Sequence, residues 1–495
     1  MCLDDSVKID RYFKIAFLLT SIISLFFAVH LELTDQEAYY WTWSRELDLS
    51  YFDHPPLQAW TTAFLTYLLG QHSWVVRLPA VFGRLATLIF FYRYALNRYS
   101  RQVAVLSVLA ILATPFFTIG SVVALPDSIS IPFALATLFF IERRKVWSAA
   151  ICFGFANLAK WTSIFFLPGY LYVLFCSEPK FKSRDKWISF IVPLLLQTPV
   201  FIWNYRHHGA SYFFHLVERH EHHVLSAATY LEHIFRFIGL QLFAGGLSII
   251  ILGFVFVRMA KFNQISETVK KHVLWWSLPA FVIVGVSAVQ GQMRFYWTGI
   301  AFFPLLAFLV HQVHSKVSVN RLARFLFGAV LLNLSLIAVA VLYPVGPIFE
   351  KVFHLRPDTR HSPRGDIAGW QGWVDNVLRP DGDINMHTAF IATNFRLAAQ
   401  IAWATQLPVI QTSTVSPQKN EYRYWPTPNP PQFNEAIFVG DNRYDEIFLF
   451  NGLCREPLQW QKYNVDFKGQ TVKIISWAKC KAPNALADNG PVTTE

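Results

Sequence analysis

The sequence predicts a polytopic α-helical membrane protein of about eleven transmembrane helices, followed by a small α+β module. Of its 495 residues, 54% are hydrophobic and only 15% are charged. Long uncharged runs fill most of the chain, and a polar composition returns after residue 343. This composition excludes a soluble enzyme. The net charge of +11 indicates no nucleic-acid partner, because Lys and Arg collect in the short loops between the apolar runs.

The apolar runs give the predicted spans and their orientation. A basic leader places the N-terminus in the cytoplasm, and no small-residue cleavage site follows the first run, which we therefore interpret as an uncleaved span. Every basic loop then falls on the cytoplasmic side, and the C-terminus falls on the opposite side. The spans are predicted at residues 15–33, 74–94, 103–123, 129–141, two short ones within 146–176, 187–203, 230–257, 273–289, 295–310 and 325–343.

Two domains follow from this pattern. Residues 1–343 are predicted to form the membrane domain, with an outer loop at 34–73, and residues 344–495 the outer module. Within the module, alternating apolar stretches predict strands at 435–439, 446–449 and 471–477, and a helix at 395–404. Residues from 481 on are expected to be disordered. Cys454 and Cys480 can form a disulfide in an oxidising compartment or remain two free thiols.

The stretch 34–58, TDQEAYYWTWSRELDLSYFDHPPLQ, is acidic and rich in aromatic residues. Its carboxylates Asp35, Glu37 and Asp53 are candidates to act on a substrate. If residues 36–47 are helical, the Tyr and Trp rings can lie at the headgroup level of a bilayer, which predicts an interfacial helix that holds acids near the membrane surface. The alternative is a connector whose rings only anchor the protein. The acids, however, contribute nothing to anchoring.

The segment EAYYWTWSRELDLSYFDHPPL resembles the first outer loop of the polyprenyl-phosphate-dependent glycosyltransferases of the GT-C class. It is most similar to the lipid A aminoarabinose and galacturonic acid transferases and to the protein O-mannosyltransferase-like family. GFANLAKWTSIFF, PVFIWNYRHHGASYFFH, RFYWTGIAFFPLLAF and IAGWQGWVDNV resemble further landmarks of that class. The resemblance implies a GT-C fold in the bacterial inner membrane, with the active site and the C-terminus in the periplasm.

It also implies the reaction. A sugar on polyprenyl phosphate would be transferred with inversion to an acceptor, either lipid A, another lipid, a glycan or a protein. No nucleotide cofactor is expected, because the chain has no glycine-rich phosphate-binding stretch. Two other functions stay open: a transporter or flippase of lipid-linked glycans, and a non-catalytic glycan-binding membrane protein. The absence of an internal repeat disfavours a transporter.

A catalytic base is expected in the loop, to accept the proton of the attacking acceptor. Relatives have Asp directly followed by Glu, whereas here Gln36 occupies the Asp position and Glu37 matches the Glu. Asp35 stands one residue earlier, and a one-residue slip would bring it into the catalytic place. We prefer Asp35 and keep Glu37 as the alternative. Asp35 can also simply cap the helix.

Cations are expected to hold the donor phosphate as its charge grows. Lys160 is the strongest candidate, because a lysine between two apolar spans is costly unless it has a partner or reaches a polar surface. His54, Arg206 and Arg294 are further candidates for phosphate binding. Arg77 and Arg84 can pair with loop carboxylates or extend to the interface.

A divalent metal site is a further expectation. Asp53 and Asp127 with His207 and His208 offer mixed oxygen and nitrogen ligands, although their spacing is not that of a compact zinc motif. The alternatives are a helix N-cap at Asp127 and a solvated surface at the histidines.

Overall fold

The structure is a computed structural model that describes residues 3–218, 226–259, 267–289, 295–342, 367–385, 387–425, 433, 435–443, 446–481 and 483–484. These residues form two compact units, each discontinuous along the chain. The helical unit comprises Met1–Ala28, His54–Gln58 and Arg77–Ser335. The sheet unit comprises Val29–Asp53, Ala59–Val76 and Leu336–Glu495. Most of the predicted outer loop 34–73 therefore belongs to the same unit as the C-terminal module.

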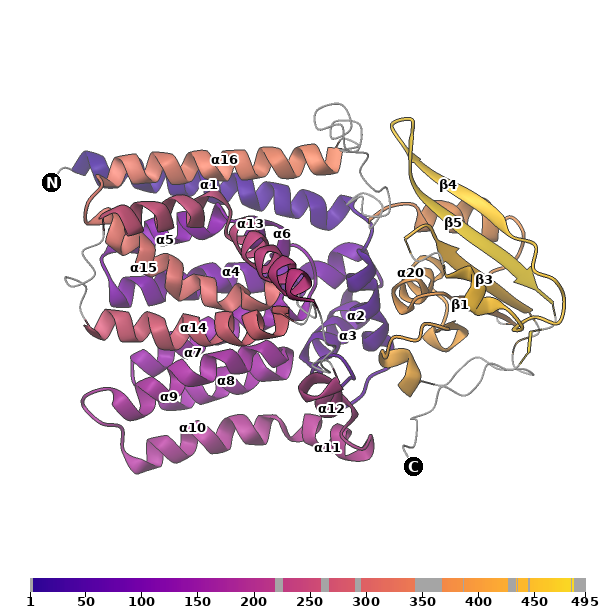
Figure 1. Ribbon diagram of the computed structural model, residues 1–495, viewed down its shortest axis with the longest axis horizontal. Coiled ribbons are helices and arrows are strands. Elements are labelled where there is room, and N and C mark those ends of the chain that lie inside the picture. Colours follow the sequence, from indigo (N-terminus) through magenta and orange to yellow (C-terminus); the bar gives the residue numbers. More distant parts are fainter. Residues whose placement is uncertain are drawn as a thin grey trace. The chain divides into compact units, whose positions relative to one another are not determined.

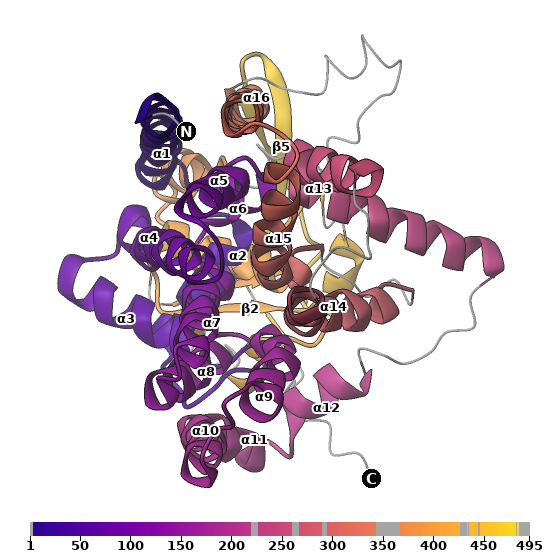
Figure 2. The same cartoon turned by 90° about the vertical axis from the view of Figure 1, so that its left-hand side faces the viewer.

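The helical unit contains helices that run largely side by side, as Figure 1 shows for α7 to α10 and as Figure 2 shows nearly end-on. The helices lying wholly or mostly in this unit are α1 (Leu3–His30), α4 (Ser73–Arg98), α5 (Arg101–Leu112), α6 (Pro115–Gly120), α7 (Pro126–Glu142), α8 (Val146–Ala159), η1 (Trp161–Phe166), α9 (Leu167–Cys176), α10 (Ser183–Leu196), α11 (Thr198–Arg206), α12 (Ala210–Leu216), α13 (Ala227–Met259), α14 (Glu267–Val289), η4 (Phe295–Ala301), α15 (Phe302–His314) and α16 (Val319–Leu342).

The helices confirm a helical membrane protein, but they do not show eleven spans. Among the described helices, six are long and apolar enough to cross a membrane, and the pair α10 and α11, bent by 46°, would make a seventh. Predicted span 103–123 is divided into α5 and α6. The predicted break at Lys160 is present, where the chain is extended between α8 and η1. The count of eleven and the orientation stay predictions.

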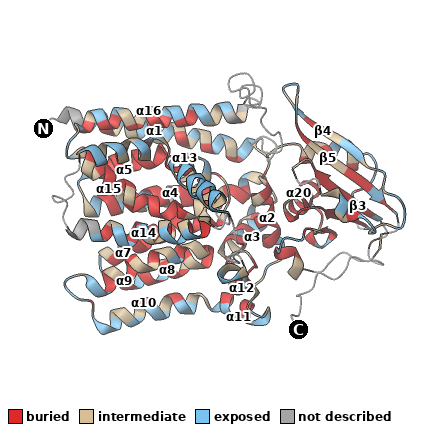
Figure 3. Cartoon of the chain, in the orientation of Figure 1, coloured by how far each residue is buried: buried red, intermediate tan, exposed pale blue. Residues whose placement is uncertain are grey.

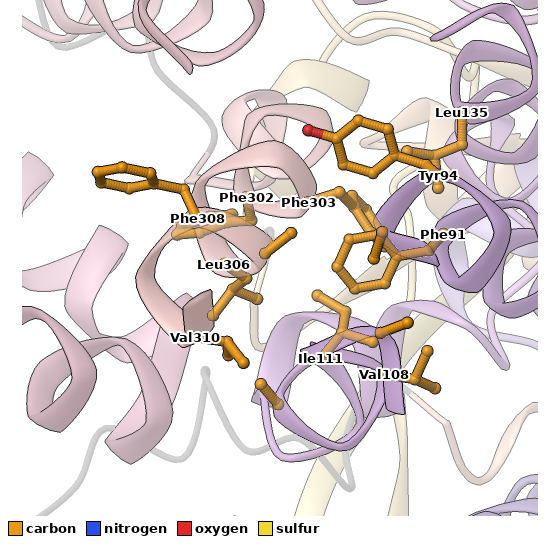
Figure 4. Close-up of a cluster of buried hydrophobic side chains, with 14 of the residues drawn as sticks. Phe91, Tyr94, Val108, Ile111, Leu135, Phe302, Phe303, Leu306, Phe308 and Val310 are labelled. Atoms are coloured by element: carbon orange, nitrogen blue, oxygen red, sulfur yellow. The ribbon is translucent and has the colours of Figure 1, made fainter. Parts of the chain in front are cut away.

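Side-chain packing holds the helical unit together. Figure 4 shows a cluster formed by side chains of α4, α5, α7 and α15, in which Phe91 and Phe303 meet edge to face with ring centroids 5.1 Å apart. Between membrane helices such packing is itself the driving force, because lipid tails are as apolar as the side chains. Figure 3 shows exposed positions along α13, where Phe235 and Val257 are 70% and 71% exposed. Apolar side chains exposed in this way suit contact with lipid.

One glycine shapes this packing. α13 passes through a non-helical residue, Gly246, whose φ is +59°. A Cβ at this position would lie 2.6 Å from Cδ of Pro115 at the start of α6. Glycine therefore satisfies both the positive φ and the close approach of α6.

The sheet unit contains one five-stranded mixed sheet of order β2-β1-β3-β5-β4. β1 pairs in parallel with β2 and β3, and β5 pairs antiparallel with β3 and β4. α20 contacts β1 and β2 and also packs against α2, as Figure 1 shows. A disulfide joins Cys454 to Cys480 at the end of β5. The elements lying wholly or mostly in this unit are α2 (Asp35–Arg45), α3 (Leu57–Leu69), α19 (Trp370–Trp373), η6 (Val374–Leu378), β1 (Thr388–Ala392), α20 (Phe395–Thr405), η7 (Val409–Gln411), β2 (Thr412–Thr414), η8 (Glu421–Tyr424), β3 (Glu435–Asp441), η9 (Ile447–Phe450), β4 (Gln461–Phe467) and β5 (Gln470–Cys480).

The predictions for the C-terminal module were partly correct. The expected helix at 395–404 and the strands at 435–439 and 471–477 correspond to α20, β3 and β5. The strand expected at 446–449 is wrong, because this segment forms the 3-10 turn η9. β1 was missed because all five of its residues are buried, so its sequence lacks the alternation that marks a half-exposed strand. Of the tail expected to be disordered, residues 485–495 lie outside the described residues.

Candidate active site

The candidate residues divide between the two units. Asp35, Glu37 and Asp53 belong to the sheet unit, whereas the other described candidates belong to the helical unit. Arg294 lies outside the described residues.

In the sheet unit, Glu37 closes a capping box at the start of α2. Its Oε2 accepts a hydrogen bond from the Thr34 backbone N–H at 2.9 Å, and the Thr34 hydroxyl accepts one from the Glu37 N–H at 3.2 Å. Glu37 is fully buried. This arrangement satisfies two backbone donors that the helix start leaves without partners. The Thr-Asp-Gln-Glu spacing already encoded the motif, which the sequence analysis overlooked.

Asp35 is the first residue of α2, and the N-cap is Thr34. The capping interpretation of Asp35 is therefore wrong. Its carboxylate instead forms an ion pair with Arg396 of α20, with 3.6 Å between Oδ2 and Nη1. This ion pair orients the Asp35 carboxylate toward Arg396 of α20. Nothing in the local sequence pointed to Arg396, which is 361 positions away.

The aromatic residues of the loop do not form an exposed interfacial face. Trp41, Trp43, Tyr51 and Phe52 are at most 1% exposed. Trp41 meets Trp403 edge to face, with ring centroids 5.0 Å apart, and the Tyr51 hydroxyl donates to the Trp43 carbonyl at 2.9 Å. The expected helix is present as α2, but its rings are buried against protein, and its position relative to the bilayer stays a prediction. Composition cannot tell whether an aromatic ring has lipid or protein as its neighbour.

A largely buried acidic cluster joins this loop to η8, with Glu421 fully buried and Asp53 partly buried. The Tyr39 hydroxyl donates to Oδ2 of Asp53 at 2.6 Å and accepts from the Glu421 backbone N–H at 2.8 Å. The Glu421 carboxylate accepts from the backbone N–H of Phe52. Burial, together with the charges of Asp53 and Asp48, raises the pKa of Glu421 well above its usual range, although the Phe52 hydrogen bond opposes this shift. We name Tyr39, Asp53 and Glu421 the acid cluster.

Tyr39 has the same electrostatic character. Burial and the neighbouring charges of Asp53 and Glu421 raise its pKa well above its usual value, so the hydroxyl stays protonated and donates a hydrogen bond to Asp53. Sequence analysis missed Glu421 entirely. A single Glu in a polar, Pro- and Asn-rich stretch carries no local sign that it is buried.

In the helical unit, Lys160 pairs with Asp127. The ammonium Nζ lies 2.6 Å from both carboxylate oxygens, and the Lys160 side chain is 1% exposed. The ring of Tyr296 also lies near the ammonium, with its centroid 4.9 Å away. The N-cap of α7 is Leu125 and not Asp127, so the capping interpretation of Asp127 is wrong as well. Two residues predicted for different roles, phosphate binding and metal binding, are thus each other's partners.

Close packing of α4 against α7 holds Asp127 in place. A Cβ at Gly83 would lie 1.9 Å from the carbonyl oxygen of Ser128, the residue that follows Asp127. Only glycine allows the two helices to approach this closely.

The helical unit also contains a large cavity of about 600 Å³. Most of its lining is apolar and comes from η1, α9 to α12 and α14, but His54, Asn157, Gln197, Tyr212 and His215 also face it. The rings of His54 and His215 stack with centroids 6.4 Å apart. The shape and lining suit a long apolar ligand with a polar end.

The remaining candidates lie around the end of α11. Arg206 is exposed there, and His208 is exposed with a φ of +52°. His207 Nδ1 lies 2.8 Å from the carbonyl oxygen of Trp203. In the described part of the chain, no three His, Cys, Asp or Glu side chains gather as a metal site requires. Among the predicted metal ligands, Asp127 contacts Lys160 and Asp53 contacts Tyr39. The metal site stays a prediction.

Comparison with known proteins agrees with this architecture. Residues 53–203 match the family described as dolichyl-phosphate-mannose-protein mannosyltransferase. The lipid A galacturonosyltransferase RgtD of Rhizobium johnstonii is 24% identical over 279 residues, a match that spans 54% of this chain and 57% of the relative. The crystal structure of ArnT from Cupriavidus metallidurans in the apo state superimposes with a TM-score of 0.62 at 14% identity, covering 94% of this chain and 97% of ArnT. ArnT bound to undecaprenyl phosphate gives a TM-score of 0.59 at 15% identity, with the same coverage.

The resemblance found in the sequence is thereby confirmed: the chain is similar to glycosyltransferases of the GT-C class, although it spans only 57% of the length of the curated relative. Its fold is the fold of ArnT along nearly its whole length.

Proposed function

We propose that this protein transfers a sugar from a polyprenyl-phosphate-linked donor to an acceptor at the periplasmic face of the bacterial inner membrane. The observation that carries the proposal is the large, mainly apolar cavity of the helical unit, which offers an apolar lining for part of a polyprenyl chain and polar side chains for its head group. The ArnT fold supports it, since a structure of ArnT holds undecaprenyl phosphate. The similarity to RgtD favours lipid A as the acceptor over a glycan or a protein.

The reaction is a single displacement. An acceptor oxygen attacks the anomeric carbon, the bond from that carbon to the phosphate oxygen breaks, and the phosphate leaves with the bonding electrons, which inverts the sugar. Asp35 is the proposed base that takes the acceptor proton, and Glu37 is the alternative. Since the Glu37 carboxylate already accepts a backbone hydrogen bond in the capping box, the geometry favours Asp35. An acceptor that is itself an ionised phosphate would need no base.

Lys160, His54, Arg206 and Arg294 are the proposed phosphate-binding groups. The charge of Lys160 is balanced by Asp127, so a donor phosphate approaching this site meets a neutral pair. The donor must therefore share or displace the Lys160 contacts as it binds. Arg206, exposed at the end of α11, carries no such counter-charge in the described structure.

The orientation is part of the proposal. A disulfide such as that between Cys454 and Cys480 persists in oxidising compartments, which supports a periplasmic C-terminal module. With a cytoplasmic N-terminus, this orientation requires an odd number of spans, as in the eleven-span prediction. A thiol reagent that cannot cross membranes would test it by labelling single cysteines placed in loops on either side.

The test is a transfer assay with the purified protein. Undecaprenyl phosphate carrying labelled galacturonic acid, aminoarabinose or mannose is mixed with lipid A, and label is expected on the lipid A. Asp35→Asn should lower the rate by about a hundredfold or more. Glu37→Gln is the matched control, because Gln also closes a capping box and so preserves the helix start. Loss in Glu37→Gln with full activity in Asp35→Asn would move the base to Glu37. No transfer from any donor to lipid A, glycan or peptide would end the proposal.

A further inference from the structure

A second, smaller cavity lies in the helical unit, lined by residues of α4, α6, α7, α13 and η4. Its volume of about 140 Å³ is room for about five water molecules, enough for a phosphate group or one end of a sugar. The lining is almost entirely apolar, with Phe116, Phe117 and Phe243 among its members. Two charged residues also line it: Arg84 and Asp127.

Arg84 is a buried cation with no anionic partner among the described residues. It is 4% exposed; Nη1 donates to the Ser121 hydroxyl at 2.8 Å and Nη2 to the Thr20 hydroxyl at 2.7 Å. These bonds use two of the five N–H groups of a guanidinium, and the buried Nε has no acceptor. Among the residues that the structure describes, no carboxylate forms an ion pair with Arg84. Arg84 also lies over the ring of Phe117, 5.3 Å from its centroid, but this contact leaves its charge unneutralised.

The other two buried cations of this region differ from Arg84 in charge balance or in position. Lys160 is neutralised by Asp127, and this pairing also removes the negative charge that Asp127 would otherwise present to the cavity. Arg77, on the same helix as Arg84 and 3% exposed, donates to the carbonyl oxygens of Phe27 and Ala28 and does not line the cavity. The net charge facing the cavity is therefore the positive charge of Arg84.

An unbalanced charge inside a membrane bundle costs folding free energy, and such residues usually mark a ligand or ion pathway. The apolar walls exclude water, so the attraction between a guanidinium and an anion is stronger here than at a surface. The planar guanidinium can also donate two parallel hydrogen bonds to a carboxylate or a phosphate.

We propose that this cavity binds an anionic group, a phosphate or a carboxylate, through Arg84. The identity of the ligand rests on the proposed function: the anion would be the donor phosphate, the carboxylate of a uronic acid sugar, or a phosphate of the acceptor lipid. Binding of the anion itself does not depend on transfer taking place.

Binding measurements on the full-length protein in lipid nanodiscs test this. The probes are undecaprenyl phosphate, diphosphorylated lipid A and sodium galacturonate, with galactose as the uncharged counterpart of galacturonate. Arg84→Gln and Arg84→Met should weaken at least one anionic probe by about tenfold or more, the loss expected when a buried charge pair loses one partner. The probe that weakens identifies the source of the anion. Arg77→Gln is the matched control and should leave all the affinities unchanged.

The melting temperature distinguishes anion binding from a purely structural role of Arg84, because the two roles predict opposite changes in Arg84→Met. Without ligand, Arg84→Met should melt at the same temperature as the wild type or higher, because it removes an unbalanced buried charge. If Arg84 only links α1 to the residues after α6 through Thr20 and Ser121, Arg84→Met should melt lower and every affinity should stay the same, which would overturn the proposal. If no sugar is transferred but anion binding still requires Arg84, the transfer function falls and this inference stands.

Discussion

The helical unit and the sheet unit each contain buried or partly buried carboxylates, and they stabilise them by opposite means. In the helical unit, Asp127 is paired with Lys160, a full opposite charge at 2.6 Å. In the sheet unit, the Asp53 carboxylate accepts a hydrogen bond from the Tyr39 hydroxyl and the Glu421 carboxylate accepts one from the Phe52 backbone N–H, and both donors are neutral. A buried acid can be stabilised by a counter-ion or by keeping its proton. The ion pair thus depends on both residues being present, whereas the acid cluster depends on pH.

The largest effect is expected from breaking the ion pair. Lys160→Ala leaves Asp127 without its partner, and such a loss costs up to about 3–5 kcal/mol for a buried pair. We expect less folded protein in membranes and a lower melting temperature. Donor affinity per folded molecule should fall too if Lys160 holds phosphate, and Lys160→Arg should restore it only in part.

The matching double variant, Lys160→Leu with Asp127→Leu, separates these two effects. Removing both charges should recover much of the melting temperature, because no unpaired charge remains. Transfer should not recover. A double variant that is as unstable as Lys160→Ala would show that the pair is not the source of the stability.

A smaller loss is expected from opening the acid cluster. Tyr39→Phe removes the hydroxyl that bridges Asp53 and the Glu421 N–H, which leaves buried polar groups without partners at a cost of about 1–3 kcal/mol. Amide hydrogen exchange should rise at residues 48–53. Tyr463→Phe is the control, because its hydroxyl only accepts an exposed hydrogen bond from Asn376 in the same unit. Equal exchange in both variants would show that the Tyr39 contacts hold nothing in place.

The pH dependence should distinguish the two units. The raised pKa of Glu421 means that the folded chain holds this proton more tightly than the unfolded chain, where the pKa is near 4.5. The contribution to stability is therefore complete below pH 4.5 and is lost as the pH rises through the raised pKa. The melting temperature of the sheet unit should fall over that window. Glu421→Gln, which cannot titrate, should flatten the fall, and an unchanged slope would assign it to another group.

The smallest effect is expected from chelation. Treatment with EDTA should leave transfer unchanged, because Asp53 and Asp127, both predicted as metal ligands, contact Tyr39 and Lys160 instead. Activity that disappears with EDTA and returns with Mg²⁺, Mn²⁺ or Zn²⁺ would mean that these contacts rearrange around a metal ion.

Local features of the structure could be predicted from the sequence, because hydrophobic periodicity and capping signals act over a few residues. The break at Lys160 follows from one lysine between two apolar runs, and the start of α2 from a polar loop after an apolar one. The class of protein could be recognised because its motifs are also local.

The partners in the site could not be predicted in the same way. Lys160 and Asp127 are 33 positions apart, and Tyr39 and Glu421 are 382 apart. No periodicity connects residues at such distances, because their contact is set by how whole helices pack. From the sequence, Lys160 was expected to bind phosphate and Asp127 a metal ion. The packing of the helices instead brings the two side chains together as an ion pair. Burial of Glu421 is likewise a property of the folded sheet unit alone.

The position of Asp127 beside Lys160 also depends on Gly83, a residue without a functional side chain, through its contact with Ser128. The would-be Cβ at position 83 falls 1.9 Å from a backbone oxygen, and backbone cannot rotate aside as a side chain can. Adding a single methyl group would push the first turn of α7 outward and move Asp127 with it. Lys160 would then lose part of its counter-charge although neither member of the pair had changed. The charge pairing of Lys160 with Asp127 therefore depends in part on Gly83 having no Cβ.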